Sequence, residues 1–260
     1  MELNKIYCED CFEVMNEIPD KFIDAIICDL PYGTTPCKWD KMLPFDELWK
    51  HYKRIIKPYG AIVLFCQQPF TTKLISSNMD MWKYNWIWVK DNGTNFLNSH
   101  YQPIKITEDI AVFSFASSSA SSSPSHSITM KYNPQKDIKA GKRYKVRQGN
   151  RTTTSVLRSL KGTNVYSESN GDRYPTNVIY FQRDTDKLHP TAKPVDLIRY
   201  LIKTYSDVGG VILDNCMGAG TTCVAAIKEK RQYIGIEKDE KYFEIARKRI
   251  EAELSQPTLF

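Results

Sequence analysis

An apolar run that ends in Asp29 is followed at once by a proline and an aromatic ring, Pro31 and Tyr32. The run, residues 23–28, indicates a buried strand, and side chains just after a strand lie at the carboxyl edge of an α/β sheet, where ligands bind. The Asp29 carboxylate and the Leu30 carbonyl could accept both hydrogens of an aromatic amine, whose lone pair is otherwise conjugated into its ring. Pro31 would keep this backbone extended, and Tyr32 could stack on a base. Fixed acceptors would stabilise charge developing on the amine, although the same residues also fit a strand followed by an ordinary turn.

A second stretch, residues 214–222, places two glycines after another apolar run. Gly218 and Gly220 permit a tight turn, and the threonines that follow would begin a helix whose free N–H groups attract an anion. Glu237 ends the next apolar run, where an acid commonly accepts hydrogen bonds from ribose hydroxyls. Because the turn lacks the third glycine of a dinucleotide fingerprint, and no G-x-x-x-x-G-K-[ST] occurs, the pattern favours a smaller adenosyl cofactor over NAD or ATP.

Helix and strand patterns alternate along most of the chain, which predicts an α/β fold. A mostly parallel sheet covered by helices on both faces would bring the ends of its strands to one edge. The expected strands are residues 6–8, 23–29, 61–65, 86–89, 110–115, 211–213 and 233–236. The expected helices are residues 11–18, 45–57, 195–205, 221–230 and 239–254, the second of them ended by Pro58-Tyr59-Gly60.

The composition is that of an ordinary globular protein, with 260 residues, 42% hydrophobic and 25% charged. No run reaches the ~18 apolar residues that span a bilayer, and we expect neither a signal peptide nor a membrane partner. Seven cysteines, an odd number, indicate reduced thiols in a cytoplasmic protein. Cys8 and Cys11 form one CxxC without a second pair at zinc-site spacing, so no metal site is expected.

Positive charge is concentrated in one segment. Residues 128–188 hold 13 Lys/Arg against 5 Asp/Glu, a balance of +8 in a chain whose total is +6. A surface that neutralises phosphates would have this charge, and so would a solvated basic loop. A serine-rich stretch, residues 116–127, precedes it and indicates a flexible linker. We therefore divide the chain into a catalytic half (1–115), a linker with a basic target-recognition insertion (116–188) and a cofactor-binding half of the same domain (189–260).

Taken together, the two motifs resemble those of the amino-methyltransferases of DNA. That family has [DNS]-P-P-[YFW] as its catalytic signature and D-P-F-x-G-x-G-T-T as its S-adenosylmethionine turn, and the catalytic-first order with an insertion between them resembles its beta group. Residues 6–11 resemble the family's G-D-C element near the cofactor's adenine, and residues 189–194 its H-P-T-x-K-P element beside the methionine end. Residues 235–237 and the last helix resemble its ribose-binding strand and final helix, so the similarity covers nearly the whole chain.

The resemblance implies a Rossmann-like methyltransferase fold with a seven-stranded type of sheet and a circularly permuted motif order. It implies S-adenosylmethionine as cofactor and places residues in two groups. The catalytic residues would be Asp29, Leu30, Pro31 and Tyr32. The cofactor-binding residues would be Asp10, Cys11, Asp29, Lys193, Asp214, Cys216, Gly218, Gly220, Thr221, Thr222, Glu237 and Lys238, with Lys193 pairing with the cofactor's carboxylate.

Two departures from the family pattern stand out. Leu30 replaces a proline, but the acceptor there is a backbone carbonyl, which leucine keeps. Asn215-Cys216 replaces Pro-Phe, which makes one apolar wall of the cofactor pocket smaller and bears on cofactor affinity.

The resemblance implies methylation of double-stranded DNA on a flipped-out base. Asp29 in place of serine favours the N6 amine of adenine by the family's tendency. The alternatives are methylation of cytosine N4 and a non-catalytic DNA-binding subunit that retains the fold. The family also allows a homodimer and a cognate restriction endonuclease as partners, in a bacterial or phage-encoded cytoplasmic protein.

Overall fold

The computed structural model describes residues 1–33, 40–94, 96–116, 128–136, 144–147, 166–169, 172–184 and 192–256. The chain forms two compact units, Met1–Asn133 with Asn177–Phe260, and Pro134–Thr176. Residues 117–127 of the expected linker, the basic pair at 142–143 and residues 189–191 of the family-like element lie outside the described residues.

The larger unit is built on an eight-stranded sheet with the order β1-β10-β9-β2-β3-β5-β4-β8. Among the described residues, five of its seven strand pairings are parallel, and only β5 runs antiparallel to its neighbours β3 and β4. This confirms the predicted mostly parallel α/β sheet. The strands are β1 (Lys5–Tyr7), β2 (Ile23–Asp29), β3 (Ile56–Cys66), β4 (Trp82–Thr94), β5 (Lys105–Phe113), β8 (Val178–Tyr180), β9 (Val211–Asp214) and β10 (Gln232–Ile236).

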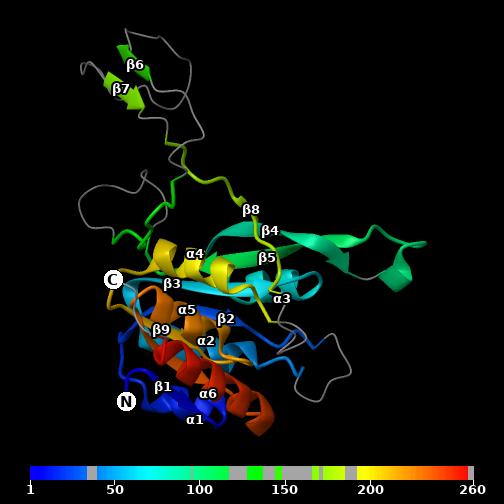
Figure 1. Cartoon of the computed structure of the whole chain (residues 1–260), viewed down its shortest axis with the longest axis vertical. Helices are drawn as coiled ribbons and strands as arrows, with labels where there is room; N and C mark the ends of the chain where they lie inside the picture. The colour runs from blue at the N-terminus through cyan, green and yellow to red at the C-terminus, as the bar shows by residue number, and fades with distance from the viewer. Residues whose placement is uncertain are drawn as a thin grey trace. The chain divides into compact units, whose positions relative to one another are not determined.

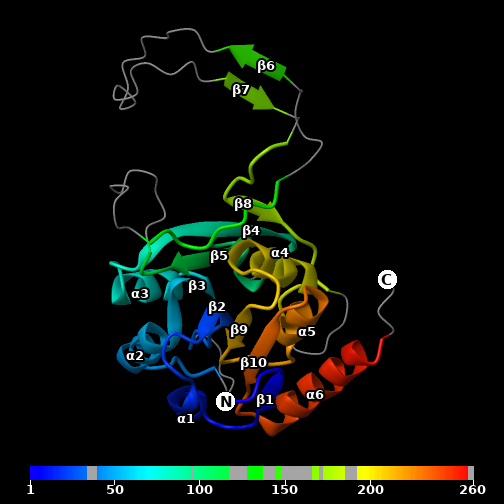
Figure 2. The same cartoon turned by 90° about the vertical axis from the view of Figure 1, so that its left-hand side faces the viewer.

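Helices cover both faces of this sheet, as the alternating pattern predicts (Figures 1 and 2). One face packs against α1 (Cys11–Glu17), α2 (Phe45–Ile55) and α3 (Phe70–Ser77), and the other against α4 (Val195–Tyr205), α5 (Thr221–Lys228) and α6 (Glu240–Leu254). Successive residues of β2 alternate between the two cores: Ile26 and Cys28 face the first set of helices, and Ala25 and Ile27 the second. Because both faces are buried, the strands are nearly continuous apolar runs.

Two local predictions were wrong. Helix α2 ends at Ile55 and β3 begins at Ile56, so the proline-glycine stretch 58–60 lies inside the strand rather than after the helix. The register between β2 and β3 passes from Ile23↔Ile56 directly to Ala25↔Ala61, so residues 57–60 bulge out of the ladder. Pro58, which has no N–H, therefore stands where the ladder requires no hydrogen bond from it. Helix α3 was not predicted, because its eight residues include two threonines and two serines and show little apolar periodicity.

Part of the expected basic insertion belongs to the larger unit. Strand β8 pairs in parallel with β4, and the N–H of Lys131 donates to the carbonyl of Tyr59 at 2.9 Å. These main-chain hydrogen bonds fix residues 128–133 and 177–184 to the sheet. A short 3₁₀ turn, η1 (Phe96–Asn98), lies between β4 and β5.

The smaller unit contains an antiparallel pair, β6 (Tyr144–Arg147) and β7 (Tyr166–Ser169), in which Tyr144 lies opposite Ser169. Two of the basic residues singled out by charge, Lys145 and Arg147, stand on β6. In the part of the chain that the structure describes, no helix is long and apolar enough to cross a membrane.

Candidate active site

A cavity of about 740 Å³ opens at the carboxyl ends of the parallel strands in the larger unit. Its walls bring together residues from both halves of the chain, which the sequence separates by the basic segment. All four expected catalytic residues line it, and so do all expected cofactor residues except Gly220.

One end of the cavity is formed by the turn between β9 and α5. Gly218 has a φ of 51°, in the left-handed region that favours glycine, and its N–H donates to Glu237 Oε2 at 2.9 Å. The N–H of Asp239 donates to the other oxygen, Oε1, at 2.8 Å. Each Glu237 oxygen keeps a second lone pair, so this carboxylate is fixed in place and can still accept hydroxyl hydrogens. Burial raises the pKa of Glu237, against the effect of the two N–H donors.

Asp214 lies at the same end and is almost fully buried. The N–H of Cys216 donates to Asp214 Oδ1 at 3.1 Å. Burial raises the pKa of the carboxyl to about 6, although its bond to the Thr222 side chain opposes the rise. The pocket therefore holds an acid that is kept charged at neutral pH at a cost in free energy.

Gly220 supports the turn from behind rather than lining the cavity. Its φ is 74°, and a Cβ at this position would come within 2.9 Å of the Cβ of Ala246 in α6. The guanidinium of Arg249, also in α6, donates to the carbonyl of Ala219 at 2.8 Å and to Thr221 Oγ1 at 3.1 Å. Gly220 thus allows the close contact between the turn and α6.

The expected N-terminal element follows β1, which pairs in parallel with β10, the strand that precedes Glu237. Asp10 caps α1 by accepting the N–H of Phe12 at 3.0 Å, and its other oxygen lies 2.9 Å from Lys238 Nζ. Cys11 and Cys216 also line the cavity. Two of the expected cofactor residues, Asp10 and Lys238, are therefore in direct contact. At the position of the family's apolar residue, Asn215 accepts the buried hydroxyl of Tyr52 at 2.6 Å.

The other end of the cavity is formed around Asp29, at the end of β2. The hydroxyl of Tyr32 lies 2.9 Å from Asp29 Oδ1, and Lys193 Nζ lies 2.7 Å from Oδ2. Leu30 buries its side chain in the core, which leaves its backbone for chemistry at the cavity. Lys193 therefore pairs with Asp29, the expected catalytic acid, whereas the family resemblance assigned Lys193 to the cofactor's carboxylate.

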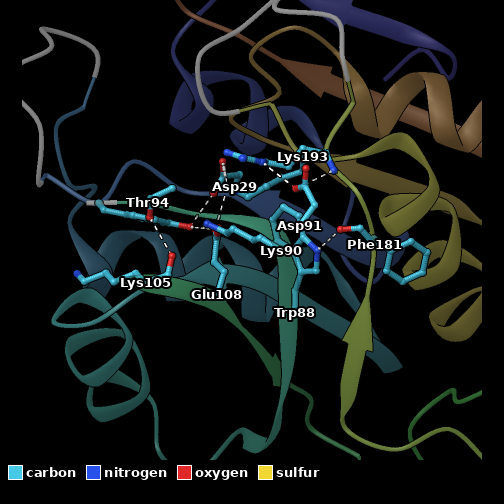
Figure 3. A network of polar contacts seen from close by, with 11 residues as sticks. Asp29, Trp88, Lys90, Asp91, Thr94, Lys105, Glu108, Phe181 and Lys193 are labelled. Carbon is cyan, nitrogen blue, oxygen red and sulfur yellow. Dashed lines mark hydrogen bonds and ion pairs between the residues drawn. The ribbon is translucent and has the colours of Figure 1, made fainter. Parts of the chain in front are cut away.

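Two residues that the sequence analysis missed complete this end. Glu108 of β5 lies 2.9 Å from Lys193 and 2.6 Å from Lys90 of β4, and its side chain is only 6% exposed (Figure 3). Burial alone would raise the pKa of Glu108, but the two ammonium groups outweigh it and lower the pKa to about 2. The available signals were a carboxylate inside an apolar strand and a lysine just after another, neither of which has a diagnostic spacing.

Burial also raises the pKa of Asp29. Lys193 opposes the rise, and the negative charge of Glu108 adds to it. The Asp29 carboxylate therefore becomes protonated at a higher pH than an exposed aspartate does.

Tyr32 is held on three sides. Its ring stacks on Phe70 with centroids 4.9 Å apart and an interplanar angle of 26°. Its hydroxyl lies 2.9 Å from Glu108 Oε1 as well as from Asp29. Lys193 Nζ lies 5.9 Å from the ring centroid. The ring is thus pre-positioned at the cavity wall.

Comparison with known proteins gives the family. The DNA methylase family model matches residues 23–248. The type II methyltransferase M.HinfI of Haemophilus influenzae is 29% identical over 280 residues, covering 95% of this chain and 68% of that protein. The type II methyltransferase M1.MboII of Moraxella bovis is 27% identical over 256 residues, covering 93% of this chain and 94% of that protein.

Solved structures show the same fold. The crystal structure of an M1.HpyAVI-SAM complex has a TM-score of 0.58 and 24% identity, covering 94% of this chain and 98% of that one. The cytosine-N4-specific PvuII DNA methyltransferase has a TM-score of 0.63 and 14% identity, covering 98% and 87%. Because the family model matches most of the sequence, this chain belongs to the DNA methylase family of N6/N4 amino-methyltransferases, as its motifs predicted. The Rossmann-like fold prediction is confirmed as well.

Proposed function

We propose that this protein is a site-specific DNA methyltransferase that transfers a methyl group from S-adenosylmethionine to the N6 amine of an adenine flipped out of the duplex. The observation that carries the proposal is the placement of Asp29 and the Gly218 turn at two ends of one cavity. An aspartate at the head of the catalytic signature, rather than a serine, favours adenine over cytosine.

The cofactor end fits an adenosyl group. A volume of about 740 Å³ has room for a nucleoside-sized cofactor beside a base. Glu237 is fixed by backbone N–H groups with lone pairs left for ribose hydroxyls, and the Gly218 turn allows close approach of a ligand. Asp10, Cys11, Cys216 and Lys238 would form the remaining wall of this end. When bound there, S-adenosylmethionine supplies an electrophilic methyl group.

The catalytic end fits the activation of an amine. The Asp29 carboxylate and the Leu30 carbonyl accept the two amine hydrogens, which favours a tetrahedral nitrogen and frees its lone pair. That lone pair forms the new N–C bond as the methyl group leaves its sulfur, so the nitrogen gains a positive charge. The charge is stabilised by Asp29 until a proton leaves to water. Tyr32 provides the ring against which the base is held.

The test is to express the chain in a host without DNA methylation and to read the DNA by single-molecule sequencing, with mass spectrometry of the nucleosides. We expect N6-methyladenine in one sequence context. N4-methylcytosine would replace the adenine assignment by the cytosine alternative. Unmodified DNA from cells that contain folded protein would contradict catalysis, and the non-catalytic DNA-binding subunit would then be the remaining alternative. Analytical ultracentrifugation of the protein purified from the same cells gives its molar mass and so shows whether it is a homodimer.

The DNA contact is assigned to the basic segment, residues 128–188, because its charge of +8 suits phosphates. The tip between β4 and β5 is a second candidate surface. Phe96, Leu97 and Tyr101 are each more than half exposed at this tip. Lys90 and Thr94 of β4, the strand that leads to the tip, line the cavity. Residues 92–107 contain no acid, which suits an anionic partner.

A further inference from the structure

Both oxygens of the Asp29 carboxylate are engaged before any base arrives. Oδ2 is paired with Lys193 at 2.7 Å, and Oδ1 lies 2.9 Å from the Tyr32 hydroxyl. Each oxygen keeps a second lone pair, but the two donors already draw on the negative charge that would attract an amine hydrogen. If Asp29 grips an amine hydrogen, as the proposed function requires, the carboxylate accepts it more strongly when one of these partners turns away. Tyr32 can yield most easily, because a hydroxyl reorients by rotation about one bond.

The structure provides a second acceptor for that hydroxyl. Glu108 Oε1 also lies 2.9 Å from the Tyr32 oxygen, and a hydroxyl has one proton to donate. The ring is fixed by its stacking on Phe70, so the proton can turn from Asp29 to Glu108 without movement of the side chain. A buried hydroxyl that lost its acceptor with no replacement would oppose the exchange.

Glu108 also competes with Asp29 for Lys193. The ammonium group lies 2.7 Å from Asp29 and 2.9 Å from Glu108, in a pocket where its side chain is 9% exposed. Lys90 neutralises Glu108 from the other side at 2.6 Å. The set of two lysines and two carboxylates is therefore neutral and shares its charges, so Lys193 is not drawn fully onto Asp29.

We propose that Glu108 is a positioning residue for amine capture: it takes over the Tyr32 hydroxyl and holds Lys193, so that Asp29 Oδ1 becomes available to the target amine. Lys90 assists by balancing the charge of Glu108. The inference rests on the proposed function, because it assigns these residues to the same methyl transfer.

The proposal fixes the direction of two pH effects. The turnover rate should fall in acid as Asp29 becomes protonated. Glu108→Gln removes a negative charge that raises the pKa of Asp29, so the acid limb of kcat should move to lower pH by about one unit. Lys90→Met leaves Glu108 charged and pulls Lys193 toward it, so the limb should move to higher pH.

The other charged and titratable groups facing this site are unchanged in both variants. They come from β2 and the segments that follow it, from β3 and β9, and from the segments after β8 and before α4. They include Cys28, Tyr32, Asp40, Lys41, Cys66, Arg183, Lys193 and Asp214. Asp214 also titrates near pH 6. Asp214 contacts neither altered side chain. Measuring kcat at saturating cofactor removes any effect of Asp214 protonation on cofactor binding, so that the acid limb of kcat reports the protonation of Asp29.

Asp109→Asn is the matched control. Asp109 is the next residue of the same strand, and its carboxylate accepts the Thr71 hydroxyl at 3.0 Å, away from the cavity. We expect the control to keep the wild-type acid limb. We expect Glu108→Gln to lower kcat about tenfold with the cofactor Kd within twofold of wild type.

The coupling to Tyr32 is tested with a double mutant. If Glu108 serves to draw the Tyr32 hydroxyl away from Asp29, Tyr32→Phe should cost little in wild type and should restore part of the lost kcat in the Glu108→Gln background. An acid limb that stays in place in both Glu108→Gln and Lys90→Met would overturn the proposal, whatever happens to the rate. If Glu108→Gln does not fold, the proposal is tested with Lys90→Met alone: its acid limb of kcat must move to higher pH, and an unmoved limb overturns the proposal. Wild-type protein that methylates no DNA would instead reject the proposed function itself.

Discussion

The two ends of the cavity, the proposed cofactor end and the proposed catalytic end, hold their carboxylates in different ways. At the cofactor end, Glu237 and Asp214 accept backbone N–H groups, among them those of Asp239 and Cys216 only two residues along the chain. At the catalytic end, Asp29 is held by side chains, and Lys193 reaches it from 164 residues away. Backbone donors carry no net charge, whereas the side chains around Asp29 bring charges of both signs.

This difference has a physical consequence. A carboxylate held by N–H groups is oriented but not neutralised, so burial raises the pKa of both Asp214 and Glu237. Burial raises the pKa of Asp29 too, whereas the pKa of Glu108, which contacts two ammonium groups, is lowered to about 2. A carboxylate among ammonium groups has a balanced charge that depends on every member of the set. The cofactor end should therefore tolerate loss of charge and fail when its backbone changes. The catalytic end should respond in the opposite way.

The largest effect is expected for Asp29→Ala. Loss of the acceptor for the amine should lower kcat by about 100-fold or more. Lys193 keeps Glu108 as a partner, so no buried ammonium is left unpaired and the fold should survive. Methyl transfer from labelled cofactor measures the rate, and calorimetry should show cofactor binding close to wild type. Normal turnover in a folded Asp29→Ala protein would remove Asp29 from the reaction.

Gly218→Val tests the cofactor end by changing the backbone conformation of its turn. A β-branched residue is strained at a φ of 51°, and a shifted N–H would release Glu237. We expect S-adenosylmethionine binding to be lost in calorimetry while the melting temperature falls only moderately. Gly220→Val is the comparison, since its Cβ would strike Ala246 and should lower stability as well as binding. Unchanged affinity in a folded Gly218→Val protein would contradict the assigned cofactor turn.

The residues at the cofactor end could be predicted from the sequence more completely than those at the catalytic end, because backbone contacts depend on local geometry and side-chain contacts depend on the fold. The turn at Gly218 and the acid Glu237 are prescribed by local backbone geometry, so their spacing is visible in the chain. Glu108 and Lys90 are single residues whose role appears only when the sheet brings β5 and β4 next to β3, on the side of β3 opposite β2. The bulge in β3 likewise depends on pairing with β2, which no local pattern around Pro58 reveals.

Asp214→Asn should stabilise the protein without bound cofactor. The native state raises the pKa of Asp214 from 3.8 to about 6, so between these values it binds more protons than the unfolded chain. Stability therefore falls as pH rises through this range, and removing the charge should raise the free energy of unfolding by about 3 kcal/mol above pH 7. The gain should vanish near pH 4, where the wild-type acid is already protonated.

Chemical denaturation at pH 7.5 and pH 4 checks this sign. The control is Asp207→Asn, at an exposed acid whose pKa is lowered by its hydrogen bond to Lys131. That substitution should be neutral or slightly destabilising at pH 7.5. If Asp214→Asn destabilised the free protein at both pH values, the hydrogen bonds to Asp214 would outweigh the cost of its charge.

Loss of charge in the basic segment should affect neither end of the cavity. Neutralising Lys142, Arg143, Lys145 and Arg147 should raise the Kd for DNA and reduce the slope of log K against log salt by up to about 3 units. Cofactor affinity should stay unchanged in the same protein. Fluorescence anisotropy over a salt series measures both slope and affinity. Wild-type values would leave the segment a solvated loop and move the DNA contact to the tip between β4 and β5.

Tyr32→Phe should have the smallest effect and separates the two functions of this side chain at the catalytic end. The variant keeps the ring stacked on Phe70, so base capture should be nearly intact. It loses the hydroxyl that lies between Asp29 and Glu108, which also removes a competitor for Asp29 Oδ1, so we expect kcat to stay within about 2-fold of wild type with little change in the KM for DNA. Tyr32→Ala removes the ring as well and should raise KM and lower kcat further. Steady-state kinetics on DNA carrying the methylated sequence distinguishes the two variants. Equal losses would mean that the hydroxyl, and not the ring face, is what the reaction requires.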